Sequence, residues 1–213
     1  MKKIFTILMS LLTISAFAAT EPAWYNDVTS ITANGQYYIY SVKGAGFVQA
    51  GQSKPKTVNA NNYSSTSDLL FTVTKAEDGK AYNGSSYLSS YQAGTCGPTG
   101  TSSDDGSNLV WTLMENGKYW NIHGKYTFSI FGTKYAALYY KDGGYAATAD
   151  VWGNKDTQTN DEYRWYLISP AQYNRHWAIY NFDKYKEGKD ITPYAGLVPT
   201  AYYNAVAAYL ATT

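Results

Sequence analysis

The chain has 213 residues, a formal net charge of +1 and a single cysteine, Cys96. Because there is no excess of basic residues, nucleic acid is not an expected partner, and one thiol excludes an internal disulfide. Tyrosine is unusually frequent, with 23 residues beside 6 Trp and 7 Phe. Tyr and Trp have apolar faces and polar tips, so this composition fits either a Tyr-rich antiparallel sheet or a surface that stacks on sugar rings.

The first residues have the pattern of a secretory signal peptide. Lys2 and Lys3 precede an apolar run over 4–14, and Ala16 and Ala18 form a small-x-small cleavage site. The apolar run is too short to span a bilayer. We therefore expect a signal peptide over 1–18, an N-terminal segment over 19–30, and a secreted protein that is extracellular, periplasmic or at the cell surface, with no membrane span after cleavage.

A weak threefold repeat follows. Three segments open with Asn-Gly or Asp-Gly before aromatic residues, and these pairs favour the positive φ angles of tight hairpin turns; they lie at 34–38, 78–82 and 116–120. Three further segments each end a repeat and have a large aromatic residue at their centre: Phe71, Trp111 or Trp165. Bulky apolar or aromatic residues lie two positions before and after each of these aromatics. In a strand, residues two positions apart point to the same face, so the three residues of each segment share one face. Each of the first two closing segments leads directly into the next opening segment, which predicts a hairpin between them.

Further strands are expected between the opening and closing segments, at 46–50, 57–60, 86–90, 134–140 and 145–152. About four short strands in each of three repeats gives about twelve strands with no helix between them. The alternative is a β-sandwich whose hairpins share Asn-Gly turns.

Taken together, these motifs resemble the ricin-type β-trefoil, and more closely the divergent trefoil modules of secreted proteins from gut Bacteroidetes. The resemblance rests on the opening 35–40 (GQYYIY) and the final 165–169 (WYLIS), and covers about 31–173. It implies an all-β, bacterial β-trefoil domain over 31–175. The Gln-x-Trp that usually closes ricin-type repeats is absent, as are the family's disulfides, so the resemblance implies the fold without implying its sugar sites. The positions of the missing Gln hold Leu69, Leu109 and Tyr163.

The C-terminal extension over 176–213 differs in character. A polar, charged stretch over 181–189 precedes a predicted short helix over 201–210, for which Thr200 is a suitable N-cap. One face of that helix holds Tyr202, Val206 and Tyr209. We expect this helix either to pack on the barrel or to lead into a further region.

Catalytic and metal-binding patterns are scarce. His123 and His176 lack the spacing of metal ligands, no Gly-x-Ser-x-Gly elbow occurs, and the acids Asp104 and Asp105 lack the ligand spacing of a calcium loop. A carboxylate pair for glycoside hydrolysis needs no local motif, so that possibility stays open. We expect no enzyme activity, no metal and no cofactor.

The best candidate site lies in the third repeat. By the resemblance, ricin-type sugar sites place an aromatic on the third strand before an Asn-Gly-type turn, and Trp152 and Asn154 match that arrangement in kind. Trp152 would stack on a pyranose, Asn154 and Asp142 would bond its hydroxyls, and Tyr139 or, as we predict, Tyr140 would complete the platform. For Trp152 the alternative is a core aromatic.

The predicted function is therefore that of a non-catalytic carbohydrate- or glycan-binding module. The alternative is a protein-interaction or adhesion module, including a trefoil-type protease inhibitor, without sugar binding. Both follow from analogy of fold, which is weak evidence for function.

Overall fold

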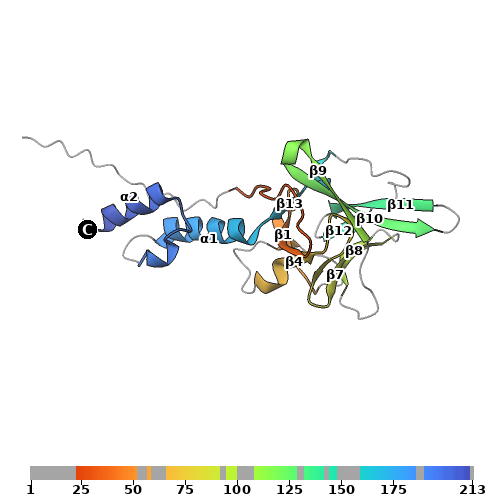
Figure 1. Ribbon diagram of the computed structural model, residues 1–213, viewed down its shortest axis with the longest axis horizontal. Helices are drawn as coiled ribbons and strands as arrows, with labels where there is room; N and C mark the ends of the chain where they lie inside the picture. The colour runs from red at the N-terminus through yellow and green to blue at the C-terminus, as the bar shows by residue number, and fades with distance from the viewer. Residues whose placement is uncertain are drawn as a thin grey trace, which may run out of the picture. The chain divides into compact units, whose positions relative to one another are not determined.

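The computed structural model describes residues 23–51, 57–58, 66–91, 95–99, 108–128, 132–141, 144–147, 159–185 and 190–211 (Figure 1). The chain divides into two compact units, one over Trp24–Tyr173 and one that contains the residues from Asn174 onward. The predicted signal peptide over 1–18 lies outside the described residues.

The unit over Trp24–Tyr173 is built from antiparallel strands in three successive repeats. Repeat one holds β1 (Gly35–Ser41), β2 (Gly46–Val48), β3 (Thr57–Val58), the 3-10 turn η2 (Thr66–Leu69) and β4 (Leu70–Val73). Repeat two holds β5 (Glu77–Gly79), β6 (Ala81–Asn83), β7 (Ser86–Tyr91), β8 (Thr95–Thr99) and β9 (Asn108–Met114). Repeat three follows the turn η3 (Glu115–Gly117) and holds β10 (Tyr119–Phe128), β11 (Gly132–Lys141), β12 (Gly144–Ala147), η4 (Asp161–Tyr163) and β13 (Trp165–Ile168).

The opening and closing strands of the repeats form a closed ring. β1 pairs with β4, β4 with β6, β5 with β9, β9 with β10, β10 with β13, and β13 with β1 again. β5 and β6 are two halves of one strand, interrupted at Lys80. The Lys80 N–H donates to the hydroxyl oxygen of Thr74, and the Lys80 carbonyl oxygen accepts from the Thr74 N–H. The ring is therefore a six-stranded antiparallel barrel, closed by the pairing of the last strand with the first.

Each repeat also contributes a hairpin outside the ring. The hairpins are β2–β3, β7–β8 and β11–β12, and each is joined by strand pairing to the opening strand of its own repeat. Three copies of opening strand, hairpin and closing strand around a six-stranded barrel constitute a β-trefoil. The predicted all-β trefoil of about twelve strands is confirmed, and the pairing excludes the two-sheet sandwich.

The Asn or Asp residues of the three opening motifs share one backbone feature. Asn34, Asp78 and Asn116 have φ angles of 57°, 55° and 55°, the left-handed conformation that Asn and Asp adopt more readily than most residues. Asn116 lies between Glu115 at φ 44° and Gly117 at φ 95°, and these three positive values reverse the chain over 115–118, between β9 and β10. The predicted turn at 116–117 is therefore confirmed.

The predicted hairpin turn at Asp78 and Gly79 is wrong. The register of β5 against β9 shifts between Glu77 and Gly79, so Asp78 is the extra residue of a β-bulge. A side chain at Gly79 would collide with the carbonyl oxygen of Lys75. Glycine is required there by this close backbone approach, which a local sequence pattern does not reveal.

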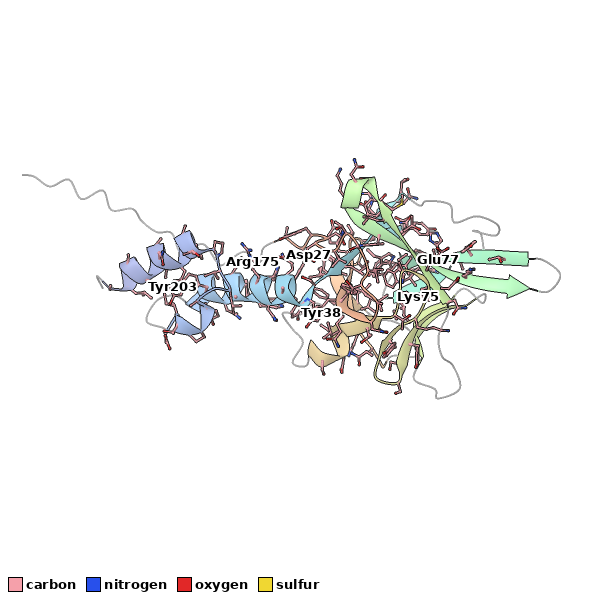
Figure 2. The ribbon with its side chains drawn as sticks, viewed as in Figure 1. Asp27, Tyr38, Lys75, Glu77, Arg175 and Tyr203 are labelled. Atoms are coloured by element: carbon pink, nitrogen blue, oxygen red, sulfur yellow. The ribbon has the colours of Figure 1, made fainter. Side chains whose placement is uncertain are left out.

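The three closing aromatics lie buried in the core of the trefoil. Phe71, Trp111 and Trp165 belong to one cluster of buried residues, and side chains crowd the interior of the trefoil unit in Figure 2. The indole Nε1 of Trp165 donates to the carbonyl oxygen of Leu138 over 3.0 Å. The predicted equivalence of the three positions as core residues is confirmed.

An N-terminal strap, defined as residues 24–28, is bound into the barrel at repeat three. The Asn26 side chain donates to the Gly117 carbonyl (2.8 Å) and accepts from the Leu167 N–H (2.9 Å). The Val28 carbonyl accepts from Trp120 Nε1 over 3.0 Å. The strap thereby satisfies polar groups of repeat three.

Helix α1 (Pro170–Tyr185) was not anticipated from the sequence. Its N-terminus is capped by Ser169, whose Oγ accepts from the Gln172 N–H over 3.1 Å. Ser, then Pro at the first helical position, then Gln at the third is the pattern of a capping box. In its first turn, the Tyr173 ring stacks on Tyr38 with centroids 3.8 Å apart, which packs that turn onto β1.

The second unit contains the remainder of α1, the 3-10 turn η5 (Thr192–Tyr194) and helix α2 (Thr200–Leu210). The predicted C-terminal helix is confirmed. Its buried Val206 belongs to a cluster with Phe182 of α1, and Tyr202 lies partly buried against the same cluster. Within the described ranges, neither helix has the length and apolar character needed to cross a membrane.

Candidate functional site

Of the four predicted ligand-binding residues, Tyr140 is described, whereas Trp152, Asn154 and Asp142 lie outside the described residues. Tyr140 is partly buried and packs against the core cluster. A side chain at Gly44 would collide with its ring, so the ring lies close over that glycine. Much of Tyr140 is therefore committed to packing.

The neighbouring residue on β11, Tyr139, has the opposite orientation. Successive residues of a strand point to opposite faces, and the Tyr139 ring lies 5.4 Å from that of Tyr163, tilted by 34°. Both rings are partly exposed. Tyr163 is placed at the end of η4, where its carbonyl accepts from the side-chain amide of the buried Asn121 over 3.0 Å. The result is an aromatic pair on the surface of repeat three.

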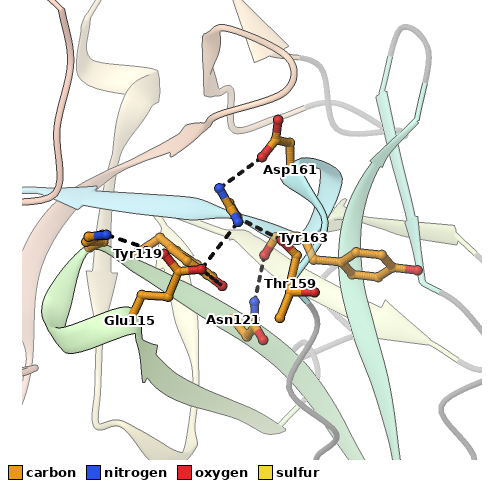
Figure 3. Close-up of polar contacts among 8 residues, drawn as sticks. Glu115, Tyr119, Asn121, Thr159, Asp161 and Tyr163 are labelled. Atoms are coloured by element: carbon orange, nitrogen blue, oxygen red, sulfur yellow. Dashed lines mark hydrogen bonds and ion pairs between the residues drawn. The ribbon is translucent and has the colours of Figure 1, made fainter.

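A polar network centred on Arg164 adjoins this pair (Figure 3). Its Nε donates to the Thr159 carbonyl oxygen at 3.0 Å, one terminal nitrogen lies 3.0 Å from Asp161 Oδ1 and the other 3.3 Å from Glu115 Oε1. The face of the guanidinium lies over the Tyr119 ring, 4.7 Å from its centroid. All three nitrogens and the flat face of Arg164 are thus engaged within the protein.

The charges of this network are balanced. Arg164 and Lys118 are set against Glu115 and Asp161, with Lys118 Nζ 3.7 Å from Glu115 Oε2. The Tyr119 hydroxyl donates to Glu115 over 3.3 Å. Burial, and then the negative charge of Glu115, raise the pKa of Tyr119 above its ordinary value, so this hydroxyl remains a donor at neutral pH.

The arrangement combines partly exposed aromatic rings with outward carboxylate oxygens. The Asp161 side chain is 60% exposed although it is ion-paired, and a carboxylate can accept several hydrogen bonds at once. Aromatic faces for stacking, with a few polar groups that fix orientation, are the elements of a small-molecule or glycan surface.

The same geometry opposes use of these acids as a hydrolytic pair. Glycoside hydrolysis needs one carboxyl that carries a proton. Glu115 and Asp161 instead both contact the guanidinium of Arg164 as ion-pair partners. Among the residues that the structure describes, no group of three or more His, Cys, Asp or Glu side chains could hold a metal ion.

The sequence indicated this repeat but missed part of the surface. Tyr163 and Arg164 were assigned to the closing strand, because the alternation of 163, 165 and 167 has period two. In the structure β13 begins only at Trp165, and η4 turns Tyr163 outward. The run of acids at 161–162 before Tyr163 was the available signal for a turn there.

No protein-family model matches the chain, and no curated protein matches it. Solved structures do match. The ricin B-like lectin of Macrolepiota procera in complex with lactose is 16% identical, with a TM-score of 0.45 over 67% of this chain and 100% of that one. SeviL bound to asialo-GM1 saccharide is 14% identical (TM-score 0.44, 65% and 99%), and the BEL β-trefoil in an apo crystal form is 16% identical (TM-score 0.43, 67% and 98%).

Proposed function

We propose that this protein is a secreted, non-catalytic carbohydrate-binding module that binds a neutral glycan on repeat three. The observation that carries the proposal is the partly exposed pair of Tyr139 and Tyr163 beside the exposed carboxylate of Asp161. The rings supply apolar faces for a pyranose, and the carboxylate accepts hydrogen bonds from its hydroxyls. The motifs at 35–40 and 165–169 support kinship with the trefoil modules of secreted Bacteroidetes proteins.

The preference for a neutral ligand follows from the charges. The positive charge of Arg164 is offset by the carboxylates of Glu115 and Asp161, and its Nε donates to the Thr159 carbonyl oxygen. Lys118, 74% exposed, lies beside Glu115, so its charge is offset locally. Salt screens exposed ion pairs of this kind. Because a neutral sugar has no charge that interacts with them, its binding should change little with ionic strength.

We propose that the ligand residues predicted from the sequence extend this surface. Asp142 follows β11 directly, and the segment that holds Trp152 and Asn154 runs from the end of β12 to Thr159 at the Arg164 network. Both segments therefore start or end on elements that flank Tyr139 and Tyr163. We propose that Trp152 stacks on the sugar, that Asn154 and Asp142 bond its hydroxyls, and that the exposed part of Tyr140 borders the site.

A glycan array with the mature chain tests the function, and Trp152→Ala tests the residue. We expect a hit among neutral glycans with an affinity of about −4 to −6 kcal/mol, that is, millimolar to high micromolar. Trp152→Ala should abolish this signal while the circular-dichroism spectrum stays unchanged. A matched control is Tyr87→Ala, which alters the partly exposed pair of Tyr82 and Tyr87 in repeat two and should leave binding intact. Normal binding by the Trp152 variant would refute that residue's role, and an array without any hit would favour the protein-interaction alternative.

A further inference from the structure

Two residues of the proposed glycan surface, Asp161 and Tyr163, belong to the short turn η4. The turn has two backbone hydrogen bonds of its own, from the Tyr163 N–H to the Asn160 carbonyl oxygen (3.0 Å) and from the Arg164 N–H to the Asp161 carbonyl oxygen (3.2 Å). A single helical turn is not stable by itself. The orientation of both side chains therefore depends on contacts between η4 and the rest of repeat three.

Arg164 supplies a connection from this turn to a distant part of the repeat (Figure 3). Its Nε donates to the Thr159 carbonyl oxygen just before η4, and one terminal nitrogen lies 3.0 Å from Asp161 Oδ1. The other terminal nitrogen lies 3.3 Å from Glu115 Oε1 in η3, the turn between β9 and β10. One guanidinium thus joins η4 to η3, and its planar fork of donors is what allows these contacts to be made together.

Strand β10 supports the same connection. The Tyr119 ring lies against the face of the Arg164 guanidinium, 4.7 Å from its central carbon, and the Tyr119 hydroxyl donates to Glu115 over 3.3 Å. The side-chain amide of the buried Asn121 donates to the Tyr163 carbonyl oxygen over 3.0 Å. Because β10 is paired with both β9 and β13 in the ring, η4 is attached to the barrel itself.

Such attachment matters for binding. A surface side chain that is free to rotate loses conformational entropy when a ligand fixes it, and a side chain that is already in place loses less. The exposed carboxylate of Asp161 contacts Arg164 through Oδ1, and its second oxygen can accept hydrogen bonds from a sugar. The charge of Arg164 is offset by Glu115 and Asp161, so its contribution lies in positioning more than in attraction.

We infer that Arg164 is a positioning residue of the glycan site, which holds Asp161 and Tyr163 in their binding orientation before a sugar arrives. This inference rests on the proposed function, and it deepens it by assigning part of the affinity to a residue that acts through others. Arg164→Lys is the direct variant, because lysine keeps the positive charge and lacks the planar fork.

The test is a titration of the isotopically labelled mature chain with lactose, maltose and cellobiose in turn, followed by amide chemical shifts and relaxation rates in NMR spectra. For a sugar that gives saturable shifts, Arg164→Lys should weaken binding about tenfold, because two side chains must then be ordered on binding. Amides within 159–164 should become more mobile in the free variant, and saturating sugar should restore their order. The fold should persist, since exposed ion pairs contribute little to stability.

Two further variants test whether the effect is specific. Lys125→Gln breaks another ion pair of β10, in which Lys125 Nζ lies 2.7 Å from Asp78 Oδ1, and it should leave both binding and the mobility of 159–164 unchanged. Glu115→Ala removes the far end of the Arg164 connection and should also weaken binding. Combined with Arg164→Lys it should add little further loss, because both changes act on the same connection.

Each outcome has a distinct meaning. Undiminished binding by Arg164→Lys, or by Glu115→Ala should the first variant not fold, would overturn the inference while leaving glycan binding established. Weaker binding without any change in the order of 159–164 would overturn it too, because Arg164 would then act on the sugar directly. An equal loss in Lys125→Gln would show that the effect is not specific to Arg164. Absence of saturable shifts with all three sugars, together with a negative array, would refute the proposed function and the inference with it.

Discussion

The pseudo-equivalent tryptophans provide a quantitative test of the fold. Trp111 and Trp165 are 5% and 0% exposed and hold the same position in repeats two and three, where repeat one has Phe71. Trp111→Phe and Trp165→Phe are therefore the same chemical change, toward a residue that the fold already accommodates. We expect their effects on the free energy of unfolding to be unequal.

The difference comes from the indole nitrogens. Trp165→Phe removes the hydrogen bond to the Leu138 carbonyl, with a net loss of about 1 kcal/mol. Trp111 Nε1 is buried, and no described residue offers it an acceptor, so Trp111→Phe relieves an unsatisfied donor by about 1 kcal/mol. The loss of ring volume is the same in both and cancels in the comparison. Trp165→Phe should therefore be the more destabilising by about 2 kcal/mol.

Urea denaturation of the two variants measures this difference, and a thermal melt should separate their midpoints by about 4 to 8 °C for a chain of this size. As a common reference for the loss of a buried aromatic, we expect each alanine substitution to lower the free energy of unfolding by about 3 to 5 kcal/mol. The three variants are Phe71→Ala, Trp111→Ala and Trp165→Ala. Equal stabilities of the two Phe variants would refute the assigned hydrogen-bonding difference. No effect of Trp111→Ala would refute the equivalence of the three positions.

Three further predictions concern the strap, the response to pH and the mature terminus. Asn26→Ala removes three side-chain hydrogen bonds and should lower the free energy of unfolding by about 2 to 4 kcal/mol in urea denaturation. Burial raises the pKa of Tyr38, burial and then Glu115 raise that of Tyr119, and the hydrogen bond to Asp78 raises that of Lys125. Each group then stabilises the fold below the pKa that it has in the unfolded chain, and this stabilisation is lost as the pH rises through the pKa in the folded chain. The free energy of unfolding should therefore fall above about pH 10. Denaturation curves that do not change above that pH would contradict this. The exported chain should begin at Ala19 or close to it, and N-terminal sequencing that finds Met1 would contradict cleavage.

Much of the barrel could be predicted because its signals are local. Period-two alternation around Phe71, Trp111 and Trp165 marks strands, and Asn before Gly at 116–117 marks a tight turn. The bulge at Asp78 could not be predicted in this way, since it depends on the close approach of Gly79 to a backbone carbonyl.

Helix α1 was missed for a different reason. The polar His176 is buried together with Tyr173, Ala178 and Phe182, so the helical period of apolar residues is weak. Ser169, Pro170 and Gln172 nevertheless form a recognisable start signal. The site was missed in part because its geometry is tertiary. Tyr139 and Tyr163 are 24 residues apart in the chain, and only the fold brings their rings together.

The asymmetry of the core accounts for why repeat three, rather than another repeat, presents its aromatic outward. Repeats one and two place leucine two positions before the closing aromatic and bury it fully. In repeat three the same part of the barrel receives two indoles, Trp120 and Trp165, paired across β10 and β13, and Val28 of the strap joins the core cluster. Trp120 also obtains its hydrogen-bond acceptor from the strap. With its interior filled by these residues, repeat three does not need the side chain at 163 for the core, and Tyr163 is left at the surface beside Tyr139.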